Sequence, residues 1–521
     1  MAIHQYYLSP CNRQYSEKKQ ESGKDNPNGY SEYVCQGNTI LTGRWHKGDE
    51  NGKTQYEYAE LELVDENGNK VIEPDLKIIV GEPVWQEHIK ESSGKAFKST
   101  DNQVIVGRRH YGDENGDTEY ATATVTLKRG SNNPTVTLVD CYWSTPIKES
   151  DGKWFKADAG CVMVGRKHTG DENGDTMYMS GRLEIDCDEV NKEFFAYRVN
   201  NVEKEFKNLP QDGFLETFEH LMYFSNIAVE HIQGYTQYQH GTETYYIFTH
   251  NTAGDYGYIM ITTETDCTNE TIIRMPKGCN HPAGIQCVGK FLFVPCEQDE
   301  KCTILVYDLL NLKPMGKEKY IEEKPVKEMK YKHRAGCVGI TDYVRNGKHY
   351  YLMVLGANEM YHVYRAEIKE DELKNDFASI DFEELNSFKL NSVEIEELQD
   401  DGSTKKETRK IDCQGIGLVT DAANEAVYMV APITWKNYCD WLYLFKLDIS
   451  TAKGDAVSAT PMLGRHMTSH GGLAGLDGIH FRWGAGIYVK ANNRLMVLTT
   501  AQGTWPPHDA NLKTNFWCAN K

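Results

Sequence analysis

Residues 106–120 read VGRRHYGDENGDTEY, and two further versions of this stretch follow the same pattern: VGRKHTGDENGDTMY at 164–178 and TGRWHKGDENGKTQY at 42–56. All three contain Gly-Arg-x-His-x-Gly-Asp-Glu-Asn-Gly-x-Thr-x-Tyr. A segment containing Glu-Ser precedes each copy, as in WQEHIKESSGKAF at 85–97. Recurrence of one unit along the chain is typical of a repeat architecture. We therefore predict a threefold β-hairpin repeat domain over residues 1–198, with copies at about 11–62, 83–127 and 141–186.

The centre of each copy has the composition of a hairpin loop. Gly supplies positive φ angles, and Asn and Asp side chains bond to the backbone of a turn. A three-residue Glu-Asn-Gly loop with a glycine bulge places the shared Arg, His, Thr and Tyr on one face and the variable residues on the other. In the second copy this register sets Gly112 opposite Thr118, His110 opposite Tyr120, and Arg108 opposite Thr122.

The shared polar face has two interpretations. It can be a buried polar network, in which each Arg pairs with the Glu of its own repeat and the His and Tyr bond across strands. Alternatively it can bind a sugar, because an aromatic ring offers a stacking surface and Arg, His and Thr bond to hydroxyl groups. Three such sites on one domain would gain avidity. The candidate ligand-binding residues are Arg44, His46, Tyr56, Arg108, His110, Tyr120, Arg166, His168 and Tyr178.

Calcium is a further alternative for the Asp-Glu-Asn-Gly-Asp stretch, whose oxygen-bearing side chains alternate as they do in calcium loops. Against it, the glycine stands at the fourth place of the stretch and no closing Glu follows. The first copy also has Lys53 at the last Asp position. We predict no other cofactor. The candidate calcium ligands are Asp113, Asn115 and Asp117 in the second copy and Asp171, Asn173 and Asp175 in the third.

The chain changes character after about residue 198. A polar linker with a short helix is predicted over 199–222, with GFLETFEHLMY at 213–223 as a helical window. Residues 223–521 then repeat a different unit: a small-residue-rich segment such as HPAGIQCVG, followed by strand-sized apolar runs such as KFLFVPC and TILVYDL. Five such units predict a five-bladed β-propeller, with glycines where the inner strands crowd the axis. The predicted fold class is therefore all-β.

These motifs resemble known families. The HPAGIQCVGKFLFVP…ILVYDL run is similar to a group of bacterial and fungal propellers of largely uncharacterised function. The GRxHxGDENGxTxY repeat resembles one found in bacterial secreted proteins. The resemblance implies this architecture and favours an extracellular or cell-surface location. It implies no catalytic residues.

The predicted propeller supplies candidates for a central funnel, namely His231, His281, Asp342 and His480. A glycosidase needs two carboxylates facing each other across such a funnel. No GxSxG, Walker A or HExxH motif occurs in the sequence. We therefore predict a non-catalytic, lectin-like carbohydrate-binding protein with glycans or glycoconjugates as partners. The alternatives are a carbohydrate-active enzyme with its active site in the funnel and the repeats as a targeting module, and a protein-binding scaffold.

Net charge narrows the range of partners. The formal charge is -19 at pH 7, whereas a nucleic-acid-binding surface needs clustered Lys and Arg. No apolar run approaches the length of a membrane span, so no membrane insertion is expected. The first residues also lack the basic-then-apolar layout of a secretory signal.

Overall fold

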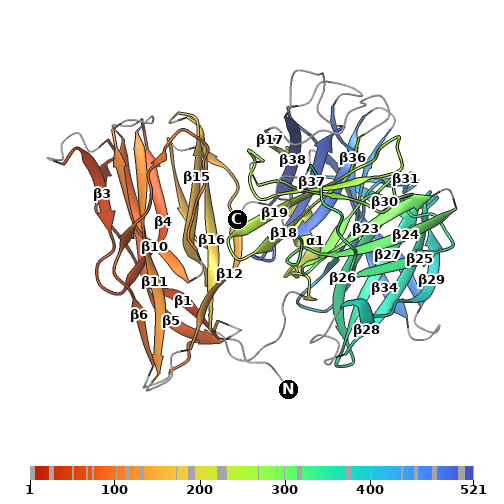
Figure 1. Cartoon of the computed structure of the whole chain (residues 1–521), viewed down its shortest axis with the longest axis horizontal. Coiled ribbons are helices and arrows are strands. Elements are labelled where there is room, and N and C mark those ends of the chain that lie inside the picture. Colours follow the sequence, from red (N-terminus) through yellow and green to blue (C-terminus); the bar gives the residue numbers. More distant parts are fainter. Residues whose placement is uncertain are drawn as a thin grey trace. The chain divides into compact units, whose positions relative to one another are not determined.

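A computed structural model gives the fold of the chain (Figure 1). It divides into two compact units, Met1–Glu189 with Gln239–Glu243, and Val190–Tyr238 with Thr244–Lys521. The structure describes residues 6–22, 28–49, 52–65, 68–72, 76–100, 102–112, 116–129, 134–148, 150–171, 173–185, 194–219, 231–267, 269–298, 300–313, 319–369, 377–399, 402–435, 438–450, 456–471, 478–502 and 511–519.

The prediction of an all-β protein is confirmed. Among these residues the regular structure is almost entirely strand, and the only α-helix is α1 (Val202–Asn208). Asn201 caps this helix by accepting a hydrogen bond from the backbone N–H of Lys204. No helix in the described ranges is long and apolar enough to span a membrane.

The first unit contains one motif hairpin for each copy of the repeat. Each hairpin is flanked on one side by strands from its own copy and on the other by a strand from a different copy. The third hairpin also pairs with the first strand of copy 1, Tyr6 opposite Ile185. The hairpins are β4 (Thr39–Lys47) with β5 (Lys53–Asp65), β10 (Gln103–Tyr111) with β11 (Asp117–Arg129), and β15 (Val162–Thr169) with β16 (Asp175–Ile185). Strands of the same copy beside them are β1 (Tyr6–Tyr15), β2 (Lys19–Gln20), β6 (Leu76–Val80), β7 (Val84–Trp85), β8 (Ile89–Lys90), β12 (Val136–Trp143) and β13 (Ile147–Lys148).

The strands that cross between copies follow a cyclic rule. From copy 1, β3 (Tyr30–Val34) pairs with β10 of copy 2. From copy 2, β9 (Phe97–Lys98) pairs with β15 of copy 3. From copy 3, β14 (Asp151–Lys156) pairs with β4 of copy 1. Each copy therefore completes the sheet of the next, and the three are linked in a closed cycle.

The predicted register of the hairpins is wrong by two residues. His110 lies opposite Thr118, and Arg108 lies opposite Tyr120. The loop has five residues because Thr169 of copy 3 pairs directly with Asp175. Its second glycine, Gly174, donates to the carbonyl of Asp171 at 2.7 Å, and a Cβ at that position would lie 1.9 Å from the carbonyl oxygen of Thr169. A shift of two residues preserves strand parity, so Arg, His, Thr and Tyr still share one face.

The second unit is a β-propeller. Its described strands form five groups of four antiparallel strands, two of which join through a parallel contact between their inner strands, Gly234 opposite Ala485. The groups are β18 (Ile232–His240), β19 (Glu243–His250), β20 (Tyr258–Thr262) and β21 (Thr271–Arg274); β22 (Gln286–Val288), β23 (Phe291–Gln298), β24 (Lys301–Asp308) and β25 (Lys327–Tyr331); β26 (Cys337–Arg345), β27 (Lys348–Ala357), β28 (Met360–Ile368) and β29 (Glu383–Lys389); β32 (Gly417–Thr420), β33 (Val427–Thr434), β34 (Asp440–Ser450) and β35 (Ala456–Met467); and β36 (Ile479–Val489), β37 (Leu495–Ala501), β38 (Leu512–Cys518) and β17 (Phe214–Phe218). A hairpin, β30 (Val393–Leu398) with β31 (Thr404–Arg409), extends the fourth group beyond β35.

Strand β17 corrects the helix predicted at 213–223. Residues 214–218 form an extended strand that pairs antiparallel with β38, while 220–230 lie outside the described residues. The Phe-Leu-Glu-Thr-Phe stretch fits either periodicity, and pairing with β38 decides for a strand. Strand β17 therefore comes from a point before the first inner strand and completes the last group. The helix α1 also packs within the propeller, through Val202 and Phe206.

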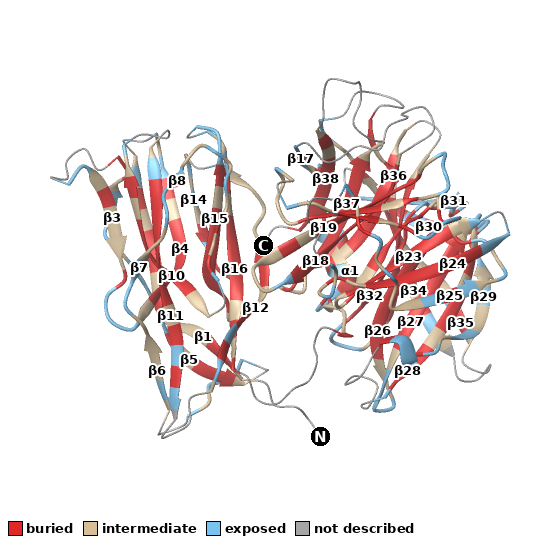
Figure 2. Cartoon of the chain, in the orientation of Figure 1, coloured by how far each residue is buried: buried red, intermediate tan, exposed pale blue. Residues whose placement is uncertain are grey.

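The blades stack through buried strands. Middle strands such as β23 and β27 are buried along most of their length, and Figure 2 shows red stretches on many propeller strands. Apolar side chains of neighbouring groups interleave, as where Val338 of β26 packs in one cluster with Phe293 of β23. This layering holds the loops and inner strand ends that form the site described below.

Candidate functional site

The shared polar side chains of the repeats lie inside the first unit. Arg44, Arg108 and Arg166 are only 2–3% exposed. The three motif histidines and three motif tyrosines are likewise buried, with exposures of 2–4%. The arrangement therefore brings together all nine of the predicted ligand-binding residues, but away from solvent.

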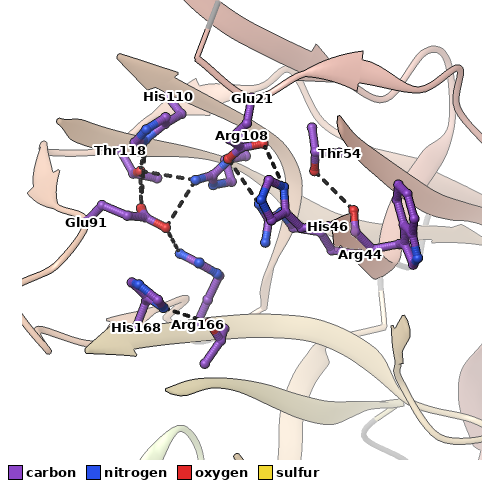
Figure 3. Close-up of polar contacts among 12 residues, drawn as sticks. Glu21, Arg44, His46, Thr54, Glu91, Arg108, His110, Thr118, Arg166 and His168 are labelled. Atoms are coloured by element: carbon purple, nitrogen blue, oxygen red, sulfur yellow. Dashed lines mark hydrogen bonds and ion pairs between the residues drawn. The ribbon is translucent and has the colours of Figure 1, made fainter. Parts of the chain in front are cut away.

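Two glutamates pair with the three arginines, as Figure 3 shows. Glu21 of copy 1 pairs with Arg44 of its own copy at 3.0 Å and also with Arg108 of copy 2. Glu91 of copy 2 pairs with Arg108 at 3.2 Å and also with Arg166 of copy 3. Each of these carboxylates thus bridges two copies. From the sequence we considered only pairs between an arginine and the glutamate of its own repeat.

A second set of bonds follows the same cycle. Each arginine donates to the tyrosine hydroxyl of the preceding copy: Arg44 to Tyr178 at 3.2 Å, Arg108 to Tyr56 at 3.5 Å, and Arg166 to Tyr120 at 3.2 Å. Each of these tyrosines stacks on an aromatic ring of its own copy, as Phe155 does on Tyr178 with ring centroids 4.3 Å apart. The pattern repeats three times, so it is a property of the repeat.

Charges in this centre are strongly coupled. Burial alone would raise the pKa of the Glu21 carboxyl, but the positive charges of Arg108 and Arg44 lower it well below its ordinary value. Burial lowers the pKa of His110, and the nearby Arg108 lowers it further. The neutral His110 ring contacts the Thr118 hydroxyl at 2.8 Å, and Thr118 donates to Glu91.

These contacts favour the structural interpretation of the motif. Every arginine has a carboxylate or phenol partner, and a sugar would reach the side chains only if the sheets separated. Buried ionic groups without partners are very costly, whereas this network supplies partners within the unit. We therefore assign the shared Arg-His-Thr-Tyr set to the joining of the three copies.

The Asp-Glu-Asn-Gly loop is likewise held by its own backbone. Asp171 accepts a hydrogen bond from the Asn173 backbone N–H at 3.0 Å, which is a turn contact. Asp113 and Asn115 lie outside the described residues. Over the described ranges, no group of three or more His, Cys, Asp or Glu side chains is arranged to hold a metal ion.

An open cavity of about 490 Å³ lies in the propeller. All five strand groups contribute to it, so it lies at one end of the axis around which they are arranged. Its lining residues are His231, Gln233, His281, Glu297, Arg334, Gly336, Ala357, Asn358, Asp412, Cys413, Gln414, Pro432, Ile433, Thr434, Trp435, Phe481, Arg482 and Trp483.

A chain of polar contacts crosses the cavity wall. The amide nitrogen of Gln233 lies 2.7 Å from Nε2 of His231 and 2.9 Å from Nε2 of His281. Since an amide nitrogen only donates, both imidazoles accept at Nε2 and carry a proton on Nδ1. His281 Nδ1 then donates to Glu297 at 2.8 Å, and Arg334 bonds to the other oxygen of Glu297.

Two residues of this chain, His231 and Glu297, have shifted pKa values. Burial, with a smaller effect of His281, lowers the pKa of His231 to about 4. Burial raises the pKa of Glu297, but hydrogen bonds from His281 and Arg334 outweigh it and lower the pKa below its ordinary value. Near neutral pH the cavity therefore presents a neutral His231 beside an ionised Glu297.

Aromatic rings also line the cavity. The Trp483 ring packs edge-on against His231 with centroids 5.3 Å apart, and the Arg482 guanidinium lies 4.5 Å above it. Trp435 is partly exposed, and its indole N–H donates to Tyr443 at 3.3 Å. The cavity thus combines ring surfaces with fixed hydrogen-bonding groups.

Of the four predicted funnel residues, only His231 and His281 line this cavity. His480 bonds to Asp440 at 3.0 Å. Asp342 is fully buried elsewhere, where it accepts from the backbone N–H of Ala196 and pairs with Arg198 at 2.7 Å. It holds the segment before α1 against the propeller, and we correct its role to a structural one.

The sequence interpretation missed the partners of the two histidines. Gln233 lies two residues after His231 on the same strand face, and strand alternation alone places it beside that ring. Glu297 ends the apolar run FLFVPCEQ of β23, where a charged residue after a buried strand was the available signal. Arg334 carried no signal in the sequence, because it lies between elements.

Comparison with known proteins yields no close relative. No protein-family model matches the chain, and no curated protein matches its sequence. Among solved structures, an α-L-arabinofuranosidase from Podospora anserina in complex with cellotriose matches at 10% identity and a TM-score of 0.33, over 60% of this chain and 99% of that one. A β-xylosidase/α-arabinofuranosidase from a compost microbial metagenome, in complex with xylotriose, matches at 11% identity and a TM-score of 0.29, over 56% of this chain and 89% of that one. The Dos1 propeller matches at 7% identity and a TM-score of 0.23, over 84% of this chain and 96% of that one.

Proposed function

We propose that this protein recognises a carbohydrate, and that the recognition site is the propeller cavity. The observation that carries the proposal is that the partly exposed Trp435 ring lines the same open cavity as the Gln233–His281–Glu297–Arg334 chain. Sugars present C–H faces that pack on aromatic rings and hydroxyls that bond to fixed donors and acceptors. A volume of about 490 Å³ lies within the usual range for small-ligand sites.

The test uses the full chain on a glycan array, followed by calorimetry with any glycan that binds. Glu297→Gln keeps the shape of the side chain and removes its charge, so we expect affinity to fall about 10- to 100-fold through the loss of about 1.5–3 kcal/mol of charge-assisted bonding. Lys128→Ala, an exposed change in the other unit, serves as the matched control. An array without binding, obtained with a folded chain, would contradict carbohydrate recognition and favour the protein-scaffold alternative.

The pH dependence of this binding is a second readout. Because the pKa of His231 is lowered to about 4, its Nε2 continues to accept the Gln233 amide well below pH 6.5. We expect affinity for a neutral glycan to hold down to about pH 5 and to fall near pH 4, where protonation removes this acceptor. Loss of binding between pH 7 and 6 would show that His231 does not control the site.

A carbohydrate-active enzyme is the second candidate, and one observation favours it. Two carboxyl groups line the same cavity, and their pKa values move in opposite directions. Hydrogen bonding holds Glu297 ionised, whereas partial burial raises the pKa of Asp412. A general acid and a base or nucleophile need such a separation. Release of reducing sugar by the wild type, abolished in Asp412→Asn, would identify the enzyme; stable complexes without product would identify the binding protein.

A further inference from the structure

Three aromatic rings gather on the outer face of the sheet formed by the copy-1 hairpin and β14 of copy 3. Trp45 on β4 lies directly opposite Trp154 on β14, so both side chains stand on the same side of the sheet. Tyr15, at the end of β1, packs edge-on against Trp154 with ring centroids 5.2 Å apart. Tyr15 is 49% exposed and both tryptophans are partly exposed. We call Tyr15, Trp45, Trp154 and the lysines around them the copy-1 outer face.

Lysines surround these rings. The Lys18 ammonium lies 4.1 Å from the centre of the Trp45 ring, and Lys156 lies 4.9 Å from that of Tyr15. Lys47 and Lys53 lie directly opposite each other where the hairpin reaches its loop, and both are exposed. Within the described ranges, Lys18, Lys47 and Lys53 take part in no ion pair.

Folding does not require two lysines at these positions, although Asp151 of β14 lies opposite Lys47 on its other side. Like charges directly opposite each other destabilise a pair of strands, and Lys47 and Lys53 are such a pair. The equivalent positions of copy 2 are Tyr111 and Asp117, and those of copy 3 are Thr169 and Asp175. The repeat therefore folds without lysine at either position.

Copy 2 also shows how a cation at the Trp45 position is satisfied internally. Arg109 occupies that position, stacks 4.2 Å from the Trp85 ring and bonds to Glu119 at 2.9 Å. Its charge is thus used within the protein. The copy-1 outer face differs because Lys18, Lys47 and Lys53 face solvent beside partly exposed rings. Its fourth lysine, Lys156, pairs with Glu57 at 3.1 Å and donates to the Tyr15 hydroxyl at 2.6 Å.

We infer that the copy-1 outer face binds an acidic polysaccharide, with uronic-acid rings packed on the aromatic side chains and their carboxylates paired with the lysines. The chain as a whole carries a charge of -19, which repels polyanions at long range. An acidic glycan would therefore be held by this local lysine group and by ring packing. This surface is separate from the propeller cavity and does not depend on the function proposed for it.

The experiment measures binding of the full chain to polygalacturonate and to the same polymer after methyl esterification, which removes its charge. We expect the wild type to bind polygalacturonate, and to bind the esterified polymer about tenfold more weakly. Trp154→Ala should bind polygalacturonate about tenfold more weakly than the wild type does. The paired change Lys47→Ala with Lys53→Ala should weaken it similarly and reduce its salt dependence.

Matched variants keep the result interpretable. Trp85→Ala changes the equivalent region of copy 2 and should leave polygalacturonate binding unchanged, while Glu297→Gln should do the same because it alters only the cavity. Lys47→Ala with Lys53→Ala are exposed changes, so a folded variant is expected even where Trp154→Ala destabilises the unit. Equal binding to the esterified polymer, an equal loss in Trp85→Ala, or tighter binding to a single-stranded oligonucleotide would each overturn the inference.

Discussion

The centre of the repeat unit and the cavity of the propeller are built by the same principle, with opposite results. Both collect polar side chains contributed by successive units of a repetitive sheet. In the repeat unit the polar groups pair with one another away from solvent: Arg108 lies between Glu21 and Glu91 and is 2% exposed. In the propeller the chain that ends at Arg334 lines an open cavity, and Arg334 is 49% exposed.

This difference shows that recurrence of a polar motif is no guide to ligand access. The arginine, histidine and tyrosine of the repeats recur three times because each copy must join the next. The cavity residues recur only in part: His231 and His281 each stand three residues before a glycine, whereas the other strand groups contribute different side chains. Residues shared by the three copies thus lie where the copies meet, whereas residues that differ between strand groups line most of the accessible cavity.

The largest expected effect comes from removing a charge in the buried polar centre of the repeat unit. Arg108→Ala removes the cation between two buried carboxylates, so that Glu21 keeps Arg44 as its arginine partner and Glu91 keeps Arg166. Removal of one partner of a buried pair costs about 3–5 kcal/mol. We expect the repeat unit to unfold at much lower guanidinium concentration, as a separate early transition. Lys128→Ala, exposed on the same hairpin, is the control and should leave both transitions in place. A loss below about 1 kcal/mol would mean that the network adds little to stability.

Acid should weaken the same centre next. The pKa of Glu21 is lowered in the folded chain, so the unfolded chain binds more protons and stability falls as pH drops below about 4.3. The lowered pKa of His110 acts in the same direction, beginning near pH 6.5. We expect the denaturant midpoint for unfolding of the repeat unit to decrease steadily as pH falls from about 6.5 to 4.3, and to decrease further below that. Glu21→Gln should make this midpoint less dependent on pH below about pH 5. An unchanged pH dependence in that variant would contradict the lowered pKa of Glu21.

The equivalent change in the cavity should have a much smaller effect on stability. Arg334→Ala removes a half-exposed partner of Glu297, which keeps its bond to His281. Exposed ion pairs contribute roughly 0–1 kcal/mol, so we expect the propeller transition to move little. Glycan affinity, measured in parallel, should fall. A loss of stability as large as that of Arg108→Ala would remove the distinction between sealed and open networks.

The smallest effect is expected at the hairpin loop. Asp171→Ala removes one turn hydrogen bond to Asn173 in an exposed loop, worth about 0.5–1 kcal/mol. The thermal midpoint should fall by a few degrees at most, equally with calcium and with chelator. A calcium-dependent midpoint in the wild type that disappears in this variant would restore the calcium interpretation of the loop.

The sequence predicted the all-β class, the hairpin repeats and the shared face of Arg, His, Thr and Tyr, because these depend on local periodicity. It did not predict the five-residue loop, since loops of three and five residues give the same parity. Pairing of β3 with β10 depends on contacts between copies, which no local pattern contains. Glu297 was missed for a similar reason: its role comes from His281 and Arg334, which reach it from other parts of the chain.

Strand β17 sets a condition on the order of events during synthesis. It leaves the ribosome before any other strand of the propeller, yet its partner β38 ends the described chain. At roughly 5–20 residues per second, about half a minute separates the two. Throughout that time Phe214–Phe218 has an unpaired edge, and the propeller lacks its final pairing. The repeat unit needs no later segment to pair its own strands, so it can mature while the rest of the protein is still being made.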